Sequence, residues 1–195
     1  MRKIVLGSVA ATSLVALAAC GGEAPADDAA TEETTEEVAA EEEAEAVEAE
    51  PVEEVAAVPP AEANGTVIEI QMLTRDPETG RQVFSPGVVV AQVGDTIRFV
   101  ATNPTHQAES IPEMLPAGVT GWEGQINEEV EYVVPAPGIY GYKCAPHYAA
   151  GMVGVIVVQG EGAGDNLEAA KAVRHIGIAT TAFEEYLAEA ETMLN

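Results

Sequence analysis

Short hydrophobic runs with a period of two dominate the chain from residue 66 onward. In residues 66–72, TVIEIQM, the apolar residues Ile68, Ile70 and Met72 occupy every second position. Successive side chains of a strand point to opposite faces of its sheet, so this period is typical of a strand that buries one face. The alternation therefore predicts a mainly β domain.

Turn signals divide the rest of this region into further short strands. Residues 88–102, VVVAQVGDTIRFVAT, place Gly94-Asp95 between two apolar runs, and residues 131–144 repeat this arrangement around Pro135–Gly138. Residues 152–158, MVGVIVV, form an unbroken apolar run, as expected of a strand buried on both faces. About eight strands at this spacing predict a β-sandwich.

The C-terminal segment has a different pattern, which predicts two short α-helices packed on the sandwich. Residues 166–173 follow a glycine-rich break and show no strand alternation, and Asp165 precedes them as a candidate helix cap. The apolar residues of the last helix share one face, and they are Phe183, Tyr186, Leu187, Ala190 and Leu194. His175 falls in the connection between the helices and is expected to be an ordinary surface residue.

The first twenty residues have the pattern of a bacterial export signal. Two basic residues precede an apolar run from Ile4 to Ala19. This run has sixteen residues, fewer than the eighteen or more of a membrane-spanning helix. The residues that end at Cys20, LAAC, resemble a lipobox, in which a lipid is attached to the cysteine and the signal is removed. We therefore expect a lipoprotein signal peptide at 1–19, with Cys20 as the first mature residue.

The next segment, residues 20–62, is expected to be a disordered, extended tether. Between residues 21 and 62 there are sixteen acidic residues and no Lys or Arg, and Ala, Thr, Val and Pro supply almost all the rest. Such a composition cannot bury a core, and its like charges repel one another. The remaining residues, 63–195, are long enough for one folded domain.

The charge and the cysteine content limit the classes of function that the domain at 63–195 can have. Its seventeen acidic and six basic residues argue against nucleic acid as a partner, because few cations are present to neutralise phosphates. An exported protein enters an oxidising compartment, where Cys20 and Cys144 could form a disulfide. A lipidated Cys20 cannot pair, and Cys144 is then a lone thiol that needs a metal or a buried position.

Three potential metal ligands lie close together in residues 144–152, CAPHYAAGM. Cys144 ends one expected strand, Met152 begins the next, and His147 lies in the loop between them. A thiolate and an imidazole bind zinc as readily as copper. The thioether favours copper, because it is a soft ligand that stabilises Cu(I) and is not a usual zinc donor.

A trigonal copper site with one Cys, two His and a distant Met needs a second imidazole. Only His106 and His175 are available, and His106 follows an expected strand whose end can meet the loop of a neighbouring hairpin at one pole of a sandwich. Each residue also has an ordinary explanation as a surface His, a core Met or a small buried Cys. Together, the Cys-x2-His-x4-Met loop and the upstream His indicate a metal site.

At these residues the chain resembles the pseudoazurins, small blue copper proteins with the cupredoxin fold. The resemblance covers residues 66–195 and rests on VGDTIRF, NPTHQAESIPEMLP, GQINEEVEYVVPAPGIYGYKCAPHYAAGMVGVIVV and DNLEAAKAV with the helical end. The terminal helices are specific, because plastocyanin-like relatives lack them. The resemblance implies a Greek-key β-sandwich of about eight strands with two short C-terminal helices.

The resemblance also implies a site and a function. One type 1 copper ion would be bound by His106, Cys144, His147 and Met152. The ion would cycle between Cu(II) and Cu(I) with no substrate on the metal, so the protein would be an electron carrier and not an enzyme. We expect a periplasmic monomer, anchored to the membrane through the lipid on Cys20, in denitrification or another respiratory chain.

The expected partners are redox proteins, a reductase or a cytochrome, that dock briefly near His147. In the family this His reaches the surface through an apolar collar. The candidates for that collar here are Met114, Leu115, Pro116, Pro146 and Ala149. A small apolar patch favours weak, transient docking.

Two departures from the family pattern affect these expectations. Gln107 follows the first His, where the family usually has an Asn that ties the two copper loops together. Lysines usually ring the copper pole, but only Lys143 remains near the site here. The residues found in place of the others are Pro104, Pro112, Glu123 and Gln125. We therefore expect a partner that is not strongly acidic, or an encounter that relies on the tether.

Two other classes of function use the same residues. A copper buffer or delivery lipoprotein could bind the ion without redox turnover, although the tether contains neither Met nor His for exchangeable metal sites. An enzyme could use Cys144 as a nucleophile with His147 or His106 as its base. The sequence offers no obvious oxyanion pocket for such an enzyme.

Overall fold

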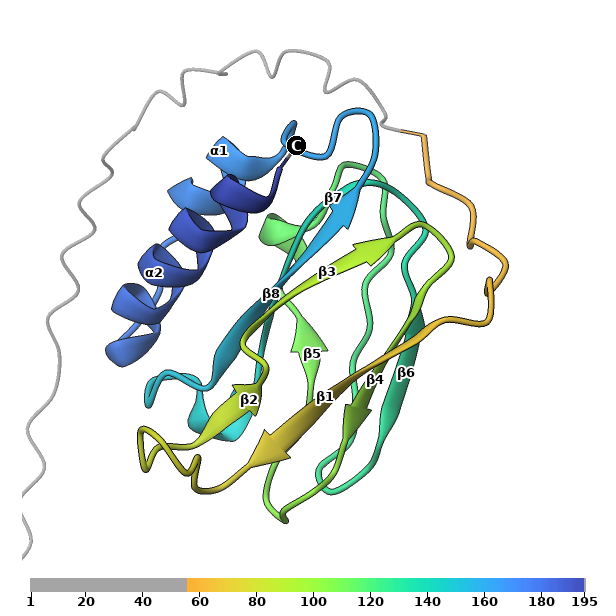
Figure 1. The fold of residues 1–195 in the computed structure, drawn as a ribbon. Coiled ribbons are helices and arrows are strands. Elements are labelled where there is room, and N and C mark those ends of the chain that lie inside the picture. The colour runs from red at the N-terminus through yellow and green to blue at the C-terminus, as the bar shows by residue number, and fades with distance from the viewer. Residues whose placement is uncertain (1–55, 195) are drawn as a thin grey trace, which may run out of the picture. The chain divides into compact units, whose positions relative to one another are not determined.

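Within the described part of the chain, eight strands form two four-stranded sheets that pack face to face (Figure 1). The computed structural model describes residues 56–194. The first sheet, in the order β2-β1-β4-β6, consists of Val83–Ser85, Val67–Leu73, Thr96–Val100 and Val130–Val133. The second sheet, in the order β3-β8-β7-β5, consists of Val88–Gln92, Val153–Gln159, Gly138–Lys143 and Glu109–Ser110. The predicted β-sandwich with C-terminal helices is confirmed.

Several sequence predictions concern residues outside this range. The expected signal peptide at 1–19, the expected lipid site Cys20 and the greater part of the tether at 20–62 lie outside the described residues. Within residues 56–194, no helix has both the length and the apolar character needed to cross a membrane.

The turn between β3 and β4 passes the chain from one sheet to the other. β3 pairs in parallel with β8, whereas β4 pairs in parallel with β1. Gly94 has φ +91° in this turn, a left-handed conformation that glycine adopts without steric cost. The buried carboxylate of Asp95 accepts hydrogen bonds from the backbone N–H of Gln92 at 2.8 Å and the side-chain amide of Asn64 at 2.7 Å. The Gly94-Asp95 signal therefore marks a turn between sheets and not a hairpin.

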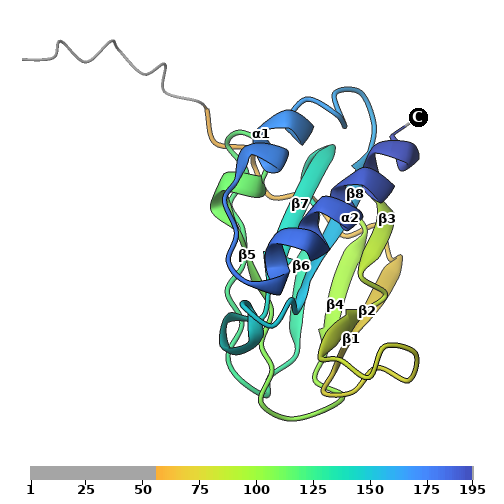
Figure 2. The same ribbon diagram turned by 90° about the vertical axis from the view of Figure 1, so that its left-hand side faces the viewer.

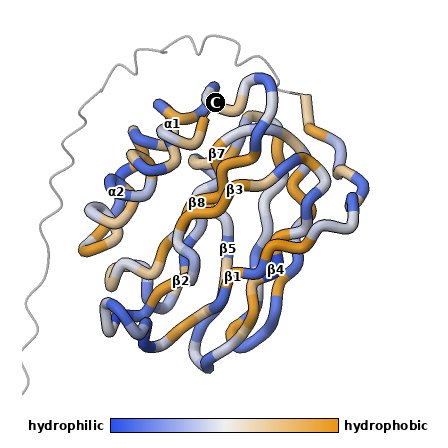
Figure 3. Tube along the Cα trace, in the orientation of Figure 1, coloured by the Kyte–Doolittle hydropathy of each residue, from blue (hydrophilic) through white to orange (hydrophobic). Residues whose placement is uncertain are grey.

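The core between the sheets is apolar and rich in aromatic rings. Phe99 on β4 is fully buried, and its ring centre lies 5.0 Å from that of Tyr142 on β7 and 5.3 Å from that of Trp122. Figure 3 shows the hydrophobic colour concentrated along strands such as β8, and the hydrophilic colour mainly in loops at the bottom of the view. The aromatic contacts join β4 to β7, the two strands that lead into the candidate site.

Two helices, α1 (Leu167–Ala172) and α2 (Ile178–Met193), cover the outer face of the second sheet (Figure 2). α2 packs on β8 and β3, which explains why β8 is buried on both faces, as its apolar run predicts. The buried residues of α2 are Ala179, Phe183, Leu187 and Ala190. The predicted cap is wrong by one residue, since Asn166 precedes α1. Its side chain bonds the backbone of Ile139 and makes no cap hydrogen bond.

The N-terminal segment joins the sandwich at the pole opposite the β7–β8 connection (Figure 1). The N–H of Val58 donates to the carbonyl of Gly118 at 2.8 Å, and the N–H of Asn64 donates to that of Gly94 at 2.8 Å. β1 and β4 then run in parallel to the other pole, where β7 also ends. Part of the expected tether, from Val58 onward, thus contacts the domain.

Candidate metal centre

His106 lies in the loop that follows β4 and is fully buried. Its carbonyl accepts a hydrogen bond from the N–H of Asn127 at 2.8 Å, which fixes the loop against the β6 side of the sandwich. Its Nε2 lies 3.0 Å from the hydroxyl oxygen of Thr74, the residue that follows β1. When Nε2 carries the proton and donates it to this hydroxyl, Nδ1 is free to bind a metal. Thr74 therefore determines which ring nitrogen faces the site.

Residues 144–152 connect β7 to β8 and carry the other three candidate ligands. Cys144, directly after β7, and Met152, directly before β8, are both fully buried. The N–H of Cys144 donates to the carbonyl of Met152 at 3.0 Å. Between them the 3-10 helix η2 (Ala145–His147) turns the chain, and the N–H of Met152 donates to the carbonyl of His147 at 3.2 Å. These bonds close the loop on itself.

Three donor atoms meet at this pole. The Nδ1 atoms of His106 and His147 lie 3.1 Å apart, and the sulfur of Cys144 lies 3.8 Å and 3.4 Å from them, respectively. Within residues 56–194, no other group of three or more His, Cys, Asp and Glu side chains is close enough to share a metal ion. The structure thus brings His106, Cys144 and His147 together. The fourth predicted ligand, Met152, lies at the end of the loop that carries Cys144 and His147.

Burial favours the uncharged forms of His106 and Cys144 in the free site. It lowers the pKa of His106, and the neighbouring His147 adds to this effect, so the neutral imidazole is favoured. Burial also raises the pKa of the Cys144 thiol, although the backbone N–H groups of Gln107 and His147 oppose that rise by hydrogen bonding to the sulfur. A thiolate here therefore needs a bound cation to form at neutral pH.

The donor set fits a copper ion. Two imidazole nitrogens and one sulfur lie within reach of a single ion, and the buried thioether of Met152 is a soft donor that suits Cu(I). His106 is fully buried and His147 half-buried, so one edge of the site reaches the surface. These residues can hold a metal ion while excluding bulk water from most of it.

A chain of contacts links the two loops that carry the candidate ligands. The side-chain amide of Gln107 donates to Glu109 at 2.7 Å, and Glu109 pairs with Lys143 at 3.1 Å. The ammonium of Lys143 in turn lies 5.1 Å from the ring centre of Tyr148, a cation–π contact. Gln107 therefore connects the loops through Glu109 and Lys143, where the family's Asn was expected to do so directly.

The expected apolar collar is wrong in three of its five members. Met114 is fully buried and Leu115 is 9% exposed, so neither forms a surface. Pro116 packs against Gly138 at the start of β7, which lies at the other pole. Of the five candidates, Pro146 and Ala149 are exposed, and both lie in the loop of His147. The error arises because the sequence does not show on which side of β5 the 3-10 helix η1 (Pro112–Met114) packs.

His175 is also not an ordinary surface residue. It is half-buried, its Nδ1 lies 2.6 Å from the hydroxyl of Tyr148, and its ring stacks on Phe183 with centres 4.1 Å apart. It takes no part in the cluster of donor atoms, which settles the choice between the two remaining histidines in favour of His106. Sequence spacing did not indicate the contact with Tyr148.

Comparison with known proteins agrees with this geometry. Residues 71–159 match the family described as "Copper binding proteins, plastocyanin/azurin family". An eight-stranded sandwich with a buried thiol between two imidazoles at one pole defines a cupredoxin with a type 1 copper centre. The pseudoazurin of Paracoccus pantotrophus is 45% identical over 106 residues, 54% of this chain and 71% of that protein. The chain belongs to the pseudoazurin family.

Other relatives match a larger part of the chain. The pseudoazurin of Methylorubrum extorquens is 39% identical over 121 residues, 62% of this chain and 78% of that protein. The structure of a Sinorhizobium pseudoazurin has a TM-score of 0.61 and 38% identity, and the match covers 65% of this chain and 98% of that one. Pseudoazurins are periplasmic electron carriers and not enzymes, and this chain is a type 1 copper electron-transfer protein.

Replacing Thr74 with Val should weaken Cu(II) binding by about 10-fold to 100-fold, because Val cannot accept a hydrogen bond from Nε2 of His106. Competition with a chelator of known affinity measures the change. Thr74→Ser, which keeps the hydroxyl, is the matched control and should bind within about threefold of the parent. Equal affinities of Thr74→Val and the parent would show that the hydroxyl does not orient the ring.

Proposed function

We propose that His106, Cys144, His147 and Met152 hold the type 1 copper ion, and that the protein carries single electrons between periplasmic redox proteins while anchored through a lipid on Cys20. The observation that supports the ligand set is the approach of two Nδ1 atoms and one sulfur to within 3.1–3.8 Å at one pole. The anchor is supported by the lipobox-like LAAC that ends at Cys20.

The residues of the site form a rigid binding site from which most water is excluded. When bound, the copper ion supplies one-electron chemistry between Cu(II) and Cu(I). Cys144 offers the strongest donor, and N–H groups of Gln107 and His147 reduce the electron density on its sulfur. The loop closed by the Cys144–Met152 backbone bond resists movement of these ligands, which limits rearrangement during each electron transfer.

Partners dock at the exposed edge of His147. Small apolar side chains surround this edge within the loop, and they are Ala145, Pro146, Ala149 and Ala150. Ile178 at the start of α2 is 42% exposed and packs against Gly151 of the same loop. A patch of this kind buries little area, so the complexes it forms are brief, as electron shuttling between a reductase and a cytochrome requires.

Charge does little to steer partners to this pole. Lys143 is paired with Glu109, and the loop between β1 and β2 contributes Arg75 and Arg81 against Asp76 and Glu78. Arg81 lines a cavity together with Ala150 and Gly151, so it is a second basic residue near the site, beyond the Lys143 identified from the sequence. These basic residues are matched by the acidic ones just named, and Glu113 near Tyr148 and Glu123 near Lys143 add negative charge, so no basic field attracts an acidic partner.

The rate of electron transfer to an acidic reductase should therefore change by less than about threefold between ionic strengths of about 0.01 M and 0.1 M. Stopped-flow reduction with a copper nitrite reductase measures it. The double variant Glu123→Lys, Gln125→Lys restores basic residues at two exposed positions and should acquire a clear decrease of rate with salt. A steep decrease in the parent protein would mean that its own charges steer the partner.

The function is tested by adding Cu(II) to the mature chain with Cys20 replaced by Ser, which stays unlipidated. An intense blue colour that ascorbate bleaches and oxygen or ferricyanide restores is the expected result. A copper complex that cannot be cycled would instead make the protein a buffer or delivery protein. Incorporation of labelled palmitate into the parent chain, and not into the Cys20→Ser chain, tests the anchor.

A further inference from the structure

The ligand loop at 144–152 is supported on its outer side by the connection between the two C-terminal helices. The carbonyl of Ala149 accepts a hydrogen bond from the N–H of Ile178, the first residue of α2, at 2.9 Å. Gly177 lies so close to Ala149 that an added Cβ would stand 2.4 Å from that carbonyl oxygen. The start of α2 therefore fits tightly against the loop.

His175, in the same connection, bonds the loop through a side chain. Its Nδ1 lies 2.6 Å from the hydroxyl of Tyr148, the residue next to His147. The ring of His175 stacks on Phe183, with centres 4.1 Å apart and planes at 28°, and Phe183 is 1% exposed in the core under α2. The hydroxyl of Tyr148 is thus tied to a ring that is itself packed on buried structure.

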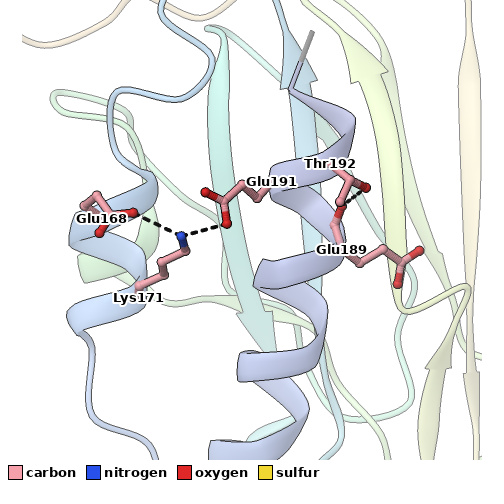
Figure 4. Close-up of polar contacts among 5 residues, drawn as sticks. All are labelled: Glu168, Lys171, Glu189, Glu191 and Thr192. Atoms are coloured by element: carbon pink, nitrogen blue, oxygen red, sulfur yellow. Dashed lines mark hydrogen bonds and ion pairs between the residues drawn. The ribbon is translucent and has the colours of Figure 1, made fainter.

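The two helices on either side of His175 are held together independently of the ligand loop. Lys171 of α1 lies 3.0 Å from Glu168 and 2.9 Å from Glu191 of α2, so it bridges the two helices (Figure 4). The same view shows the hydroxyl of Thr192 donating to the carbonyl of Glu189 near the end of α2. Ion pairs at the surface contribute little free energy, but here they add to the apolar packing between the helices.

The surroundings of His175 favour its neutral form, because burial lowers its pKa. When the Tyr148 hydroxyl donates to Nδ1, the ring proton lies on Nε2. Nε2 has no hydrogen-bond partner among the residues that the structure describes. The Tyr148 hydroxyl is therefore the one described polar group that holds the ring in place.

We propose that His175 is a positioning residue of the copper centre: it fixes Tyr148, and through Tyr148 the part of the ligand loop that carries His147. The C-terminal helices then stabilise the ligand loop in addition to packing on the second sheet. The cation–π contact of Lys143 with the ring of Tyr148 extends this support toward the loop of His106, through Glu109 and Gln107. This inference rests on the ligand set proposed above.

Hydrogen exchange of the metal-free Cys20→Ser chain tests the proposal without copper. The N–H groups of Gly151 and Met152, which close the loop, should exchange about tenfold faster in Tyr148→Phe and in His175→Ala. The double variant should exchange no faster than either single variant, because both remove the same hydrogen bond. His175→Gln, whose amide oxygen can accept from Tyr148, should restore the parent rate to within about threefold. Arg174→Ala, at an exposed neighbour in the connection, should leave the rate unchanged.

A second measurement of the same proposal uses the copper-loaded protein. Tyr148→Phe should shift the thiolate-to-copper absorption band and accelerate Cu(II) loss to a chelator about tenfold, and His175→Ala should match it. Parent-like exchange and parent-like spectra in Tyr148→Phe, or additive effects in the double variant, would overturn the proposal. Tyr148→Phe removes a single oxygen, so it provides the test even where His175→Ala does not fold. A parent chain that never turns blue would refute the ligand set instead, and the exchange experiment would still decide the role of His175.

Discussion

Replacing Cys144 with Ser is expected to abolish the blue colour of the copper-loaded protein and to weaken copper binding by more than about 100-fold. The colour depends on a thiolate bound to Cu(II), and the Ser hydroxyl is a poorer donor that does not ionise in a buried site. Visible absorption and electron paramagnetic resonance after addition of Cu(II) measure the loss. Cys20→Ser, at the other cysteine of the chain, is the matched control and should remain fully blue.

A loss of colour that is due to the missing ligand must be distinguished from a loss that is due to unfolding of the variant. Cys144 is 0% exposed, and a buried hydroxyl without a good partner costs about 1–3 kcal/mol. Urea denaturation of the metal-free variant should therefore still show a cooperative transition. A blue Cys144→Ser protein would remove this residue from the ligand set, and with it the type 1 assignment of the site.

Replacing Phe99 with Ala is expected to lower the free energy of unfolding by about 3–5 kcal/mol. The side chain is fully buried between the sheets, edge-on to Phe84 at 6.0 Å and to Tyr142 at 5.0 Å. The cavity left by Ala would separate β4 from β7, the strands that lead to His106 and Cys144. Such a loss is a large part of the 5–15 kcal/mol that stabilises a typical domain.

Urea denaturation of the metal-free protein measures this change. Val67→Ala, at a position 43% exposed on β1 of the same sheet, is the control and should alter stability by less than about 0.5 kcal/mol. A change below about 1 kcal/mol for Phe99→Ala would mean that the core collapses around the missing ring. In that case the aromatic cluster would not be what holds the two ligand strands together.

The strands and the ligand loop could be predicted because their signals are local. Ile68, Ile70 and Met72 alternate in the sequence as they do in β1, and the unbroken apolar run at 152–158 reflects burial of β8 under α2. The Cys-x2-His-x4-Met spacing specifies a loop that closes on itself, as the backbone bond between its ends shows. Local spacing was sufficient for these elements.

Features that depend on contacts between distant segments could not be predicted in this way. Gly94 indicates a turn, but only the pairing of β3 with β8 shows that the turn changes sheets. Thr74 and His175 each make their important contact with a residue 32 or 27 positions away, and neither has a sequence signature. Met114 was assigned to the surface because nothing in the sequence shows that it packs against Gly141.

The attachment of the N-terminal segment has a mechanical consequence. β1 contains seven residues, so the start of the strand near Asn64 and its end near Thr74 are separated by about 20 Å. The two hydrogen bonds that attach this segment, Val58–Gly118 and Asn64–Gly94, lie at the far end of the sandwich from His106. A force applied to the chain before Val58 would therefore break these two bonds before it reached the loops that carry His106 and Cys144.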